Sequence, residues 1–356
     1  MPMHGATPQE TADRSVAAWL FIVAGMVFAM VIVGGLTRLT ESGLSMTDWR
    51  PVTGWLPPLD EAAWQRVFDG YRQIPEYTQL NAGMTLDEFK NIFWLEYLHR
   101  LFGRTIGIVF FVPFFWFAAR RMLDRPLFWM LAGLLALGAL QGGIGWYMVS
   151  SGLSERTDVS QYRLALHLGV AVVIYILLLR LALWLRHGRP AIMSNNWLNA
   201  TRTLLGLAFV TTIAGAFVAG LNAGMTYNTF PLMDGELVPS NIYDTSPAWS
   251  AAFEDVTTVQ FNHRVLASVT LLTILGAWIV AVRSGGKPLI CKPVGFAACA
   301  ALLQYLLGVS TLLSVVRIDL AVLHQAGAMV LITMLVYAVF CAGRPGFTGE
   351  MQGSKG

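Results

Sequence analysis

Eight long apolar segments constrain the fold of this chain more than any other feature. They run over about 16–36, 92–119, 127–149, 162–185, 201–222, 260–282, 293–315 and 319–342. Each is long enough to cross a bilayer as a helix, which takes about 20 apolar residues for a hydrocarbon core of roughly 30 Å. Open strands are disfavoured there, because lipid offers their backbone polar groups no hydrogen-bond partner. The sequence therefore predicts an all-α polytopic membrane protein with eight transmembrane helices.

Charged residues are too scarce for a soluble enzyme. They make up 13% of the chain, against roughly 25% in an ordinary soluble domain, whereas hydrophobic residues make up 55%. The net charge of +3 gives no support for a nucleic-acid partner. Cys291, Cys299 and Cys341 form no Cys-x-x-Cys pair, and we interpret them as apolar fillers.

The charges of the connecting loops predict the direction of the helices. The basic connections are 120–126, 180–202 and 283–292, which include Arg189 and Lys287. The long loop 37–91 has five basic and eight acidic residues, and the loop 223–259 has five acidic residues and no Lys or Arg. By the positive-inside rule, the basic connections are cytoplasmic and both termini lie inside. The two long loops then face the outer compartment.

The first long loop, 37–91, is rich in Trp, Tyr, Pro and Gly. A loop of this length without a function is uncommon, so one interpretation is that it covers a site at the outer face. An aromatic belt at the membrane interface is the alternative.

An internal repeat divides the chain into two halves. Residues 96–100 read Glu-Tyr-Leu-His-Arg, and residues 260–264 read Gln-Phe-Asn-His-Arg. Each motif is followed, one hairpin later, by a second intramembrane histidine. Because each unit has an even number of spans, the two units run parallel. We predict two pseudo-symmetric four-helix bundles, a first half at 16–185 and a second half at 201–342.

Four of the six histidines lie inside predicted spans, where ionisable groups are costly and are therefore functional candidates. His99 and His167 lie in the first half, and His263 and His324 in the second. All four are near the outer ends of their helices, so each half presents two imidazoles at matching depth. Such a pair can hold a haem iron inside a four-helix bundle. The alternative is four packing histidines, hydrogen-bonded across the helices.

Small residues near these histidines would let a flat macrocycle approach the backbone. They are Gly103, Gly169 and Gly327.

Arg100 and Arg264 each follow the first histidine of a pair. Arginine binds carboxylates bidentately, so both are candidates for binding haem propionates at the outer face. Snorkelling of each side chain to the interface explains them equally well.

The two halves differ at one chemically important position. Glu96 lies three residues before His99, so both fall on one face of the helix. The matching residue in the second half is Gln260. A carboxylate beside a haem can take or give a proton, or stabilise a developing cation. This asymmetry predicts a reactive first half and a second half that only holds haem, unless Glu96 serves merely as the ion-pair partner of Arg100.

The sequence resembles the haem A synthase family, in its proteobacterial and mitochondrial branch, from about residue 16 to 342. The resemblance rests on Glu96-x-x-His99-Arg100, His167, His263-Arg264, His324, Gly34-Gly35-Leu36-Thr37-Arg38-Leu39-Thr40, Gly43-Leu44-Ser45-Met46, Asp48-Trp49-Arg50-Pro51 and Pro75-Glu76-Tyr77. It implies a bacterial inner-membrane enzyme with its active site near the periplasmic face, or the corresponding face of the mitochondrial inner membrane.

The resemblance implies that a methyl group of haem O is oxidised to a formyl group by successive hydroxylations, giving haem A for cytochrome oxidase. It implies substrate haem at His99 and His167, and a b-type haem as electron carrier at His263 and His324. Glu96 matches the essential carboxylate of the family. The implied partners are haem O, a haem O synthase, cytochrome oxidase assembly factors and the lipid bilayer, with a homo-oligomer as a further option. Some members carry a cysteine pair in the first outer loop, which this chain lacks.

Two other functions compete with this enzyme. A di-haem b-type electron-transfer cytochrome would hold both haems permanently, and the Glu96/Gln260 difference counts against it. A transporter would also use parallel repeats and buried ionisable groups. It would be colourless and would have polar residues near the midplane, whereas the ionisable groups here cluster at one face.

Overall fold

The computed structural model describes residues 7–50, 53–153, 156–188, 194–283 and 288–344. Pro51, Arg189 and Lys287 lie outside the described residues. Within the described ranges the secondary structure is helical apart from one isolated bridge between Met233 and Glu236. The long helices are α1 (Pro8–Leu39), α4 (Leu86–Ala119), α5 (Arg125–Val149), α6 (Gln161–Arg186), α7 (Asn196–Gly220), α9 (Val256–Arg283), α10 (Pro288–Leu313) and α11 (Ile318–Ala342).

These helices confirm the predicted fold class, because in the described residues eight of them are long and apolar enough to cross a membrane. All eight begin earlier than hydropathy predicts, and α1 and α4 do so by the most, at Pro8 and Leu86. Both are started by capping boxes. The Glu10 amide donates to Thr7 Oγ1 at 3.2 Å, and Thr85 with Glu88 repeats the arrangement. Such caps satisfy the free N–H groups of a first turn without apolar residues, which is why hydropathy misses them.

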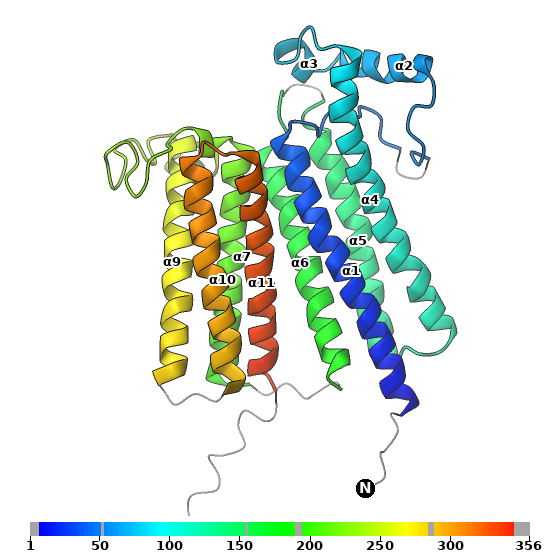
Figure 1. Ribbon diagram of the computed structural model, residues 1–356, viewed down its shortest axis with the longest axis vertical. Coiled ribbons are helices and arrows are strands. Elements are labelled where there is room, and N and C mark those ends of the chain that lie inside the picture. Colours follow the sequence, from blue (N-terminus) through cyan, green and yellow to red (C-terminus); the bar gives the residue numbers. More distant parts are fainter. Residues whose placement is uncertain (1–6, 51–52, 154–155, 189–193, 284–287, 345–356) are drawn as a thin grey trace, which may run out of the picture.

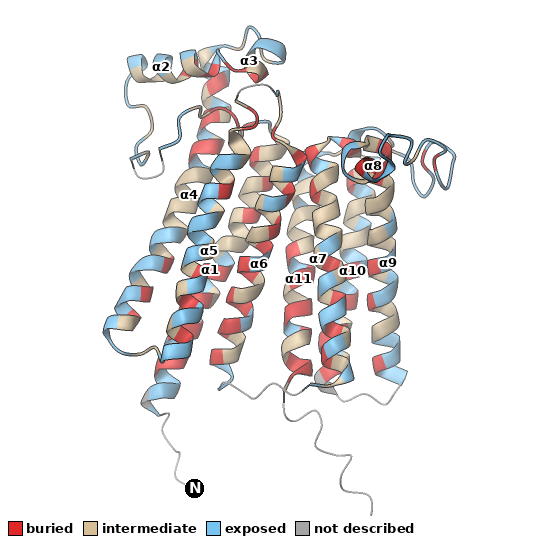
Figure 2. Ribbon diagram, turned by 180° about the vertical axis from the view of Figure 1, so that it is seen from behind, coloured by how far each residue is buried: buried red, intermediate tan, exposed pale blue. Residues whose placement is uncertain are grey.

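The long helices form two adjacent groups (Figure 1). The first half consists of α1, α4, α5 and α6, and the second half of α7, α9, α10 and α11. The halves meet along α1, α6, α7 and α11, and α1, α6 and α11 are the most buried spans (Figure 2). Hydrogen bonds cross this seam: Tyr175 Oη lies 2.7 Å from Thr333 Oγ1, and Gln325 Nε2 donates to the Val31 carbonyl at 2.7 Å. One apolar core therefore runs through both halves.

Both long loops lie at the same end of the helices, opposite the start of α1 and the end of α11 (Figure 1). The first loop contains α2 (Glu61–Tyr71) and α3 (Pro75–Gln79), and the second contains the short turn η1 (Ala223–Met225) and α8 (Ala248–Glu254). The first loop is thus a small folded cap rather than an irregular connection. Its core packs α2 against the projecting start of α4 through Phe68, Tyr71, Phe89 and Phe93.

Candidate functional site

The two intramembrane histidines of the first half each lie against a glycine of a neighbouring helix. A Cβ atom added at Gly34 on α1 would be 3.3 Å from His99 Nε2 on α4. A Cβ atom at Gly145 on α5 would be 3.1 Å from His167 Cε1 on α6. The rings of His99 and His167 are close enough for their charged forms to repel. The fold therefore brings this predicted pair together between four helices.

The second half repeats this arrangement. Gly215 on α7 faces His263 on α9, and a Cβ atom there would lie 3.1 Å from its Cε1. Gly308 on α10 faces His324 on α11, with a corresponding distance of 2.8 Å. His263 and His324 are also within electrostatic reach of one another. In all four cases glycine gives an imidazole the space that any larger side chain would take.

These four glycines differ from the ones that the sequence singles out. Gly103, Gly169 and Gly327 instead contact Met30, Ile213 and Gln304, respectively, from other helices. The three side chains fill the space next to these glycines, so the glycines serve helix packing. A signal for the right ones exists in the repeat. Gly145 and Gly308 each lie four residues after a glutamine, Gln141 or Gln304.

Glutamine side chains also mark matching places in the two halves. Gln141 Nε2 lies 3.2 Å from His167 Nδ1 and donates to the His167 carbonyl at 2.9 Å. Gln304 lies beside Gly327, three residues after His324. Gln141 thus bonds to the helix that carries the second histidine of its half, as expected of interhelical hydrogen bonding, and Gln304 packs against the matching helix of the second half.

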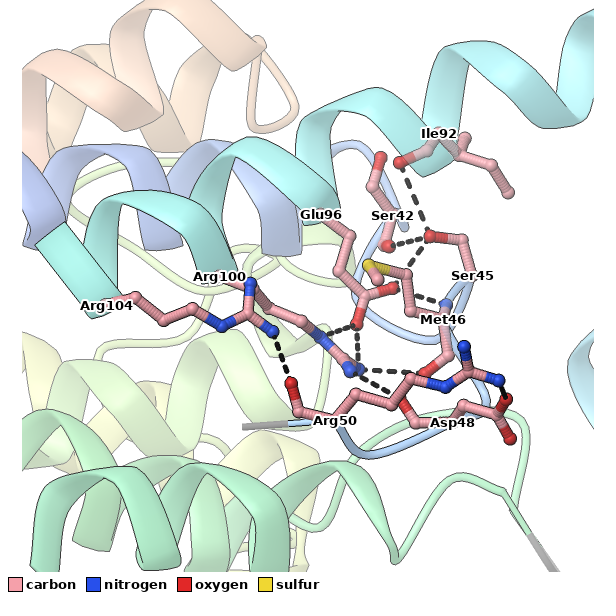
Figure 3. Close-up of polar contacts among 9 residues, drawn as sticks. All are labelled: Ser42, Ser45, Met46, Asp48, Arg50, Ile92, Glu96, Arg100 and Arg104. Atoms are coloured by element: carbon pink, nitrogen blue, oxygen red, sulfur yellow. Dashed lines mark hydrogen bonds and ion pairs between the residues drawn. The ribbon is translucent and has the colours of Figure 1, made fainter. Parts of the chain in front are cut away.

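Glu96 is buried where α4 meets the first outer loop, with 2% of its surface exposed. Its Oε2 accepts hydrogen bonds from Ser45 Oγ at 2.7 Å and from the Met46 amide at 2.8 Å. Its Oε1 accepts two from the Arg100 guanidinium, that from Nε at 3.0 Å (Figure 3). Four donors around one carboxylate fix its orientation and tie the first outer loop to α4 one helical turn before His99.

Arg100 ties this network to the chain beyond it. Its guanidinium donates to the Met46 carbonyl at 2.8 Å and to the Asp48 carbonyl at 3.0 Å (Figure 3). It also lies over the Trp49 ring, 5.4 Å from its centre. Arg100 therefore binds the first outer loop in this conformation. The fold brings the Ser45 hydroxyl and the Met46 amide to Glu96, and the Met46 and Asp48 carbonyls to Arg100.

The second half has the same frame with one changed contact. Arg264 donates to the Tyr227 carbonyl at 2.7 Å, as Arg100 does to Met46. Gln260 takes the place of Glu96, but its Nε2 donates to the loop, to the Ala223 carbonyl at 2.8 Å. The carboxylate receives hydrogen bonds from its loop, and the amide gives them. Arg264 Nε is buried and has no hydrogen-bond partner among the described residues, so one donor remains for an anionic group.

Arg38 links the two halves at the outer end of α1. Its Nη2 donates to the Ala219 carbonyl at 3.2 Å and to Asn222 Oδ1 at 2.9 Å, both on the second half. Asp158, from the first half, is 3.7 Å from the same atom, and Asn222 Nδ2 donates to it at 3.2 Å. These contacts fix the position of the first outer loop relative to α7.

The residues of each half fit a haem group. Each glycine leaves its imidazole against a backbone. In the second half, the buried Nδ1 atoms of His263 and His324 make no well-formed hydrogen bond within the described residues, although the backbones of Thr211 and Gln304 lie close to the two rings. An unpaired buried nitrogen is costly, and ligand binding fixes the tautomer of such a ring. Elsewhere in the described residues, no group of three or more His, Cys, Asp or Glu could hold a metal ion.

The folded cap contains a second buried carboxyl group. Tyr71 Oη donates to Glu76 Oε1 at 2.8 Å, and Asn81 Nδ2 donates to Tyr71 Oη at 2.8 Å. Burial raises the pKa of Glu76 to about 7, an effect that Tyr71 opposes and nearby carboxylates, Glu41 first among them, reinforce. The sequence alone marks this residue only as part of a Pro-Glu-Tyr motif.

Known proteins resemble this chain over nearly its whole length. Residues 17–336 match the model of a family described as cytochrome oxidase assembly protein. A haem A synthase of Rhodospirillum centenum is 52% identical, over 95% of this chain and 91% of its own. A haem A synthase of Parvibaculum lavamentivorans is 49% identical, over 95% of this chain and 98% of its own. One from Nitrosospira multiformis is 45% identical, over 93% and 95%, respectively.

Proposed function

This chain belongs to the family of cytochrome oxidase assembly proteins, and we propose that within it the chain acts as a haem A synthase. The observation that carries the proposal is the match to proteins of that name at 45–52% identity over more than nine tenths of both chains. As an oxidoreductase of this kind, it converts a methyl group of haem O to the formyl group of haem A through successive hydroxylations. Cytochrome oxidase is the destination of the product.

The two halves take different haems in this proposal. The substrate haem binds at His99 and His167, and a haem b binds at His263 and His324. What supports the assignment is the single changed contact between otherwise matching frames, a buried carboxylate at Glu96 in the first half. The haem b would supply a one-electron redox group to the reaction.

Glu96 is the proposed catalytic residue of the first half. Its carboxylate lies one helical turn from His99, on the side of the outer loop. To take a proton, its Oε2 has to release the hydrogen bond from Ser45 or from Met46. Arg100 holds the other oxygen throughout, so the carboxylate keeps its orientation. We assign Arg100 to positioning of Glu96 and of the loop, and Arg264, with its unpaired Nε, to an anionic group such as a haem propionate.

Eight apolar helices make the chain an integral membrane protein. We place it in a bacterial inner membrane, with both termini cytoplasmic and the haem sites near the periplasmic face. The charge asymmetry of the loops supports this direction. Delivery of haem O by a haem O synthase, transfer of haem A to assembly factors and a homo-oligomeric state belong to the proposal and follow from the family alone.

A di-haem electron-transfer cytochrome is the second candidate. The observation that favours it is the nearly identical packing of the two histidine pairs, each ring against a glycine. Such a protein would keep both haems and convert neither.

Haem extraction and chromatography of the purified protein, from cells that also make haem O, separates the two candidates. We expect haem A together with haem B in the wild type, and loss of haem A with retention of haem B in Glu96→Gln. A matched control is Glu61→Gln, which changes an exposed acid of α2. Haem B alone in every sample, unchanged by Glu96→Gln, would contradict the synthase and support the cytochrome.

A further inference from the structure

We propose that an apolar groove between α1 and α4 holds the isoprenoid side chain of the substrate haem, an inference that rests on the proposed function. The groove has a volume of about 340 Å³, within the usual range of roughly 300–1,000 Å³ for ligand pockets. It is lined by Val33 of α1 and by Leu98, Leu101, Phe102 and Thr105 of α4. α1 and α4 lie side by side within the first half (Figures 1 and 2).

The groove adjoins the first histidine of the substrate site. Leu98 directly precedes His99, and Phe102 lies one helical turn after it on the same face. On α1, Val33 directly precedes Gly34, the residue against which the His99 ring packs. Consecutive residues of a helix point to different faces, so the groove lies beside the His99 site, at the same depth of α1 and α4, and Phe102 borders both. An apolar substituent of a haem bound at His99 would reach the groove by passing Phe102.

The chemistry of the lining suits a hydrocarbon chain. Four of the five lining side chains are apolar, and the fifth, Thr105, turns its hydroxyl back to donate to the Leu101 carbonyl at 3.0 Å. Leu98, at the outer end, is 51% exposed. An isoprenoid chain that moves from lipid into this groove loses no hydrogen bond and gains packing contacts. Packing contacts are what favours association inside a membrane.

The second half differs at the corresponding place. Asn262 precedes His263 as Leu98 precedes His99. Its Nδ2 donates to Tyr243 Oη of the second outer loop at 2.9 Å. A polar pair therefore occupies the outer end of this face in the half that we assign to haem b. Haem b has a vinyl group where haem O has the isoprenoid chain, so the contrast between the halves matches the contrast between the two haems.

Filling the groove tests the proposal. The protein in lipid nanodiscs is titrated with haem O and with haem B, and the site is identified by its loss in His99→Ala. In Thr105→Phe we expect haem O affinity at this site to fall roughly ten- to hundredfold, with haem B affinity unchanged. Val269→Phe is the matched control, at the equivalent position of α9, and should leave haem O affinity as it is.

An exchange at the outer end gives a second test that involves an exposed residue and spares the core. Leu98→Asn copies the second half and should lower the preference of the His99 site for haem O over haem B. Asn262→Leu, the reciprocal variant, should leave that preference unchanged.

Three results would overturn the proposal: equal affinities of the wild-type site for the two haems, equal weakening of both in Thr105→Phe, or no effect of either first-half variant. The last would mean that a bilayer acyl chain, or nothing, occupies the groove. A wild type that binds haem O through His99 with this preference, but yields no haem A, would contradict the proposed synthase and leave the groove assignment standing.

Discussion

The two halves of this protein share one frame and differ at contacts that we propose give them different chemistries. Each half packs two imidazoles against two glycines and anchors an arginine to the carbonyl of an outer loop. Three residues before the first histidine, the two halves differ. Glu96 accepts hydrogen bonds from its loop, whereas Gln260 donates to its own. On the proposed assignment, a reactive carboxylate is added to a haem-holding bundle by reversing the polarity of this contact.

The two outer loops differ more in structure than the histidine sites beneath them. The first outer loop folds into a cap with its own aromatic core, closed by Tyr71 and Glu76. The second outer loop carries only the turn η1 and the seven-residue helix α8. We expect the half that carries out the reaction to have the folded cap. A site from which water is excluded strengthens the electrostatic interactions on which catalysis depends.

Removal of one histidine from either half should have the largest effect on activity and haem content. We expect His99→Ala and His263→Ala to lose all synthase activity, since neither half replaces the other. Their haem contents should differ: His263→Ala loses haem B, whereas His99→Ala retains it and lacks haem A. Haem extraction and optical spectra measure this directly. The same haem content in both variants would refute the division of labour between the halves.

Exchange of the polar residues should produce the next largest effect. Glu96→Gln should lower turnover by roughly 10²–10⁴-fold, the usual range for loss of an acid–base group. Gln260→Glu should instead reduce haem B retention, because a carboxylate would face the Ala223 carbonyl without a donor, at about 1–3 kcal/mol. Turnover assays and haem content distinguish the two. Full activity of Glu96→Gln would leave only the structural role of an ion-pair partner.

The glycines that face the histidines should give a graded effect on haem binding. A Cβ would lie 2.8 Å from the ring at Gly308, 3.1 Å at Gly145 and at Gly215, and 3.3 Å at Gly34. We therefore expect alanine to reduce haem retention most at Gly308 and least at Gly34, by about 1–3 kcal/mol of overpacking in the tightest case.

Gly142→Ala serves as the control for this series, because nothing lies within 4 Å of its position. Haem retention is measured by dialysis against apomyoglobin. Equal losses at all four glycines and at Gly142 would mean that these substitutions act on helix stability rather than on the rings.

The smallest expected effect concerns the cap of the first half. The pKa of Glu76, about 7 in the folded cap against an ordinary 4.5, means that the folded state binds a proton that the unfolded chain releases between these values. Stability of the cap should therefore fall as the pH rises from 4.5 to 7 and level off above, by at most about 3 kcal/mol. Hydrogen exchange of α2 and α3 at pH 5 and pH 8 measures this.

Two variants test whether Glu76 is the group responsible for this pH dependence. Glu76→Gln should abolish the pH dependence. Tyr71→Phe should move it to higher pH, because the Tyr71 hydrogen bond holds the pKa of Glu76 down. An unchanged profile in Glu76→Gln would assign the pH dependence to another group.

Prediction from sequence succeeded where a property is local and periodic. Hydropathy located all eight spans found in the described residues, but it placed the start of each helix too late, most of all for α1 and α4, where polar capping boxes extend the helices. It failed where contacts are non-local. Gly103 was a reasonable candidate for a close approach because it lies near His99 in sequence, yet its space is filled by Met30 from another helix.

Hydropathy and histidine spacing alone predict an eight-helix membrane protein with four histidines in two matched pairs, because bilayer thickness and the cost of buried polar groups act on each segment separately. The tertiary structure decided which glycine faces which histidine, and that Glu96 holds Ser45 and Met46 of the outer loop. The groove between α1 and α4 likewise exists only in the folded structure. Such features depend on how helices far apart in sequence pack together, and packing is a property of pairs of surfaces that no single segment specifies.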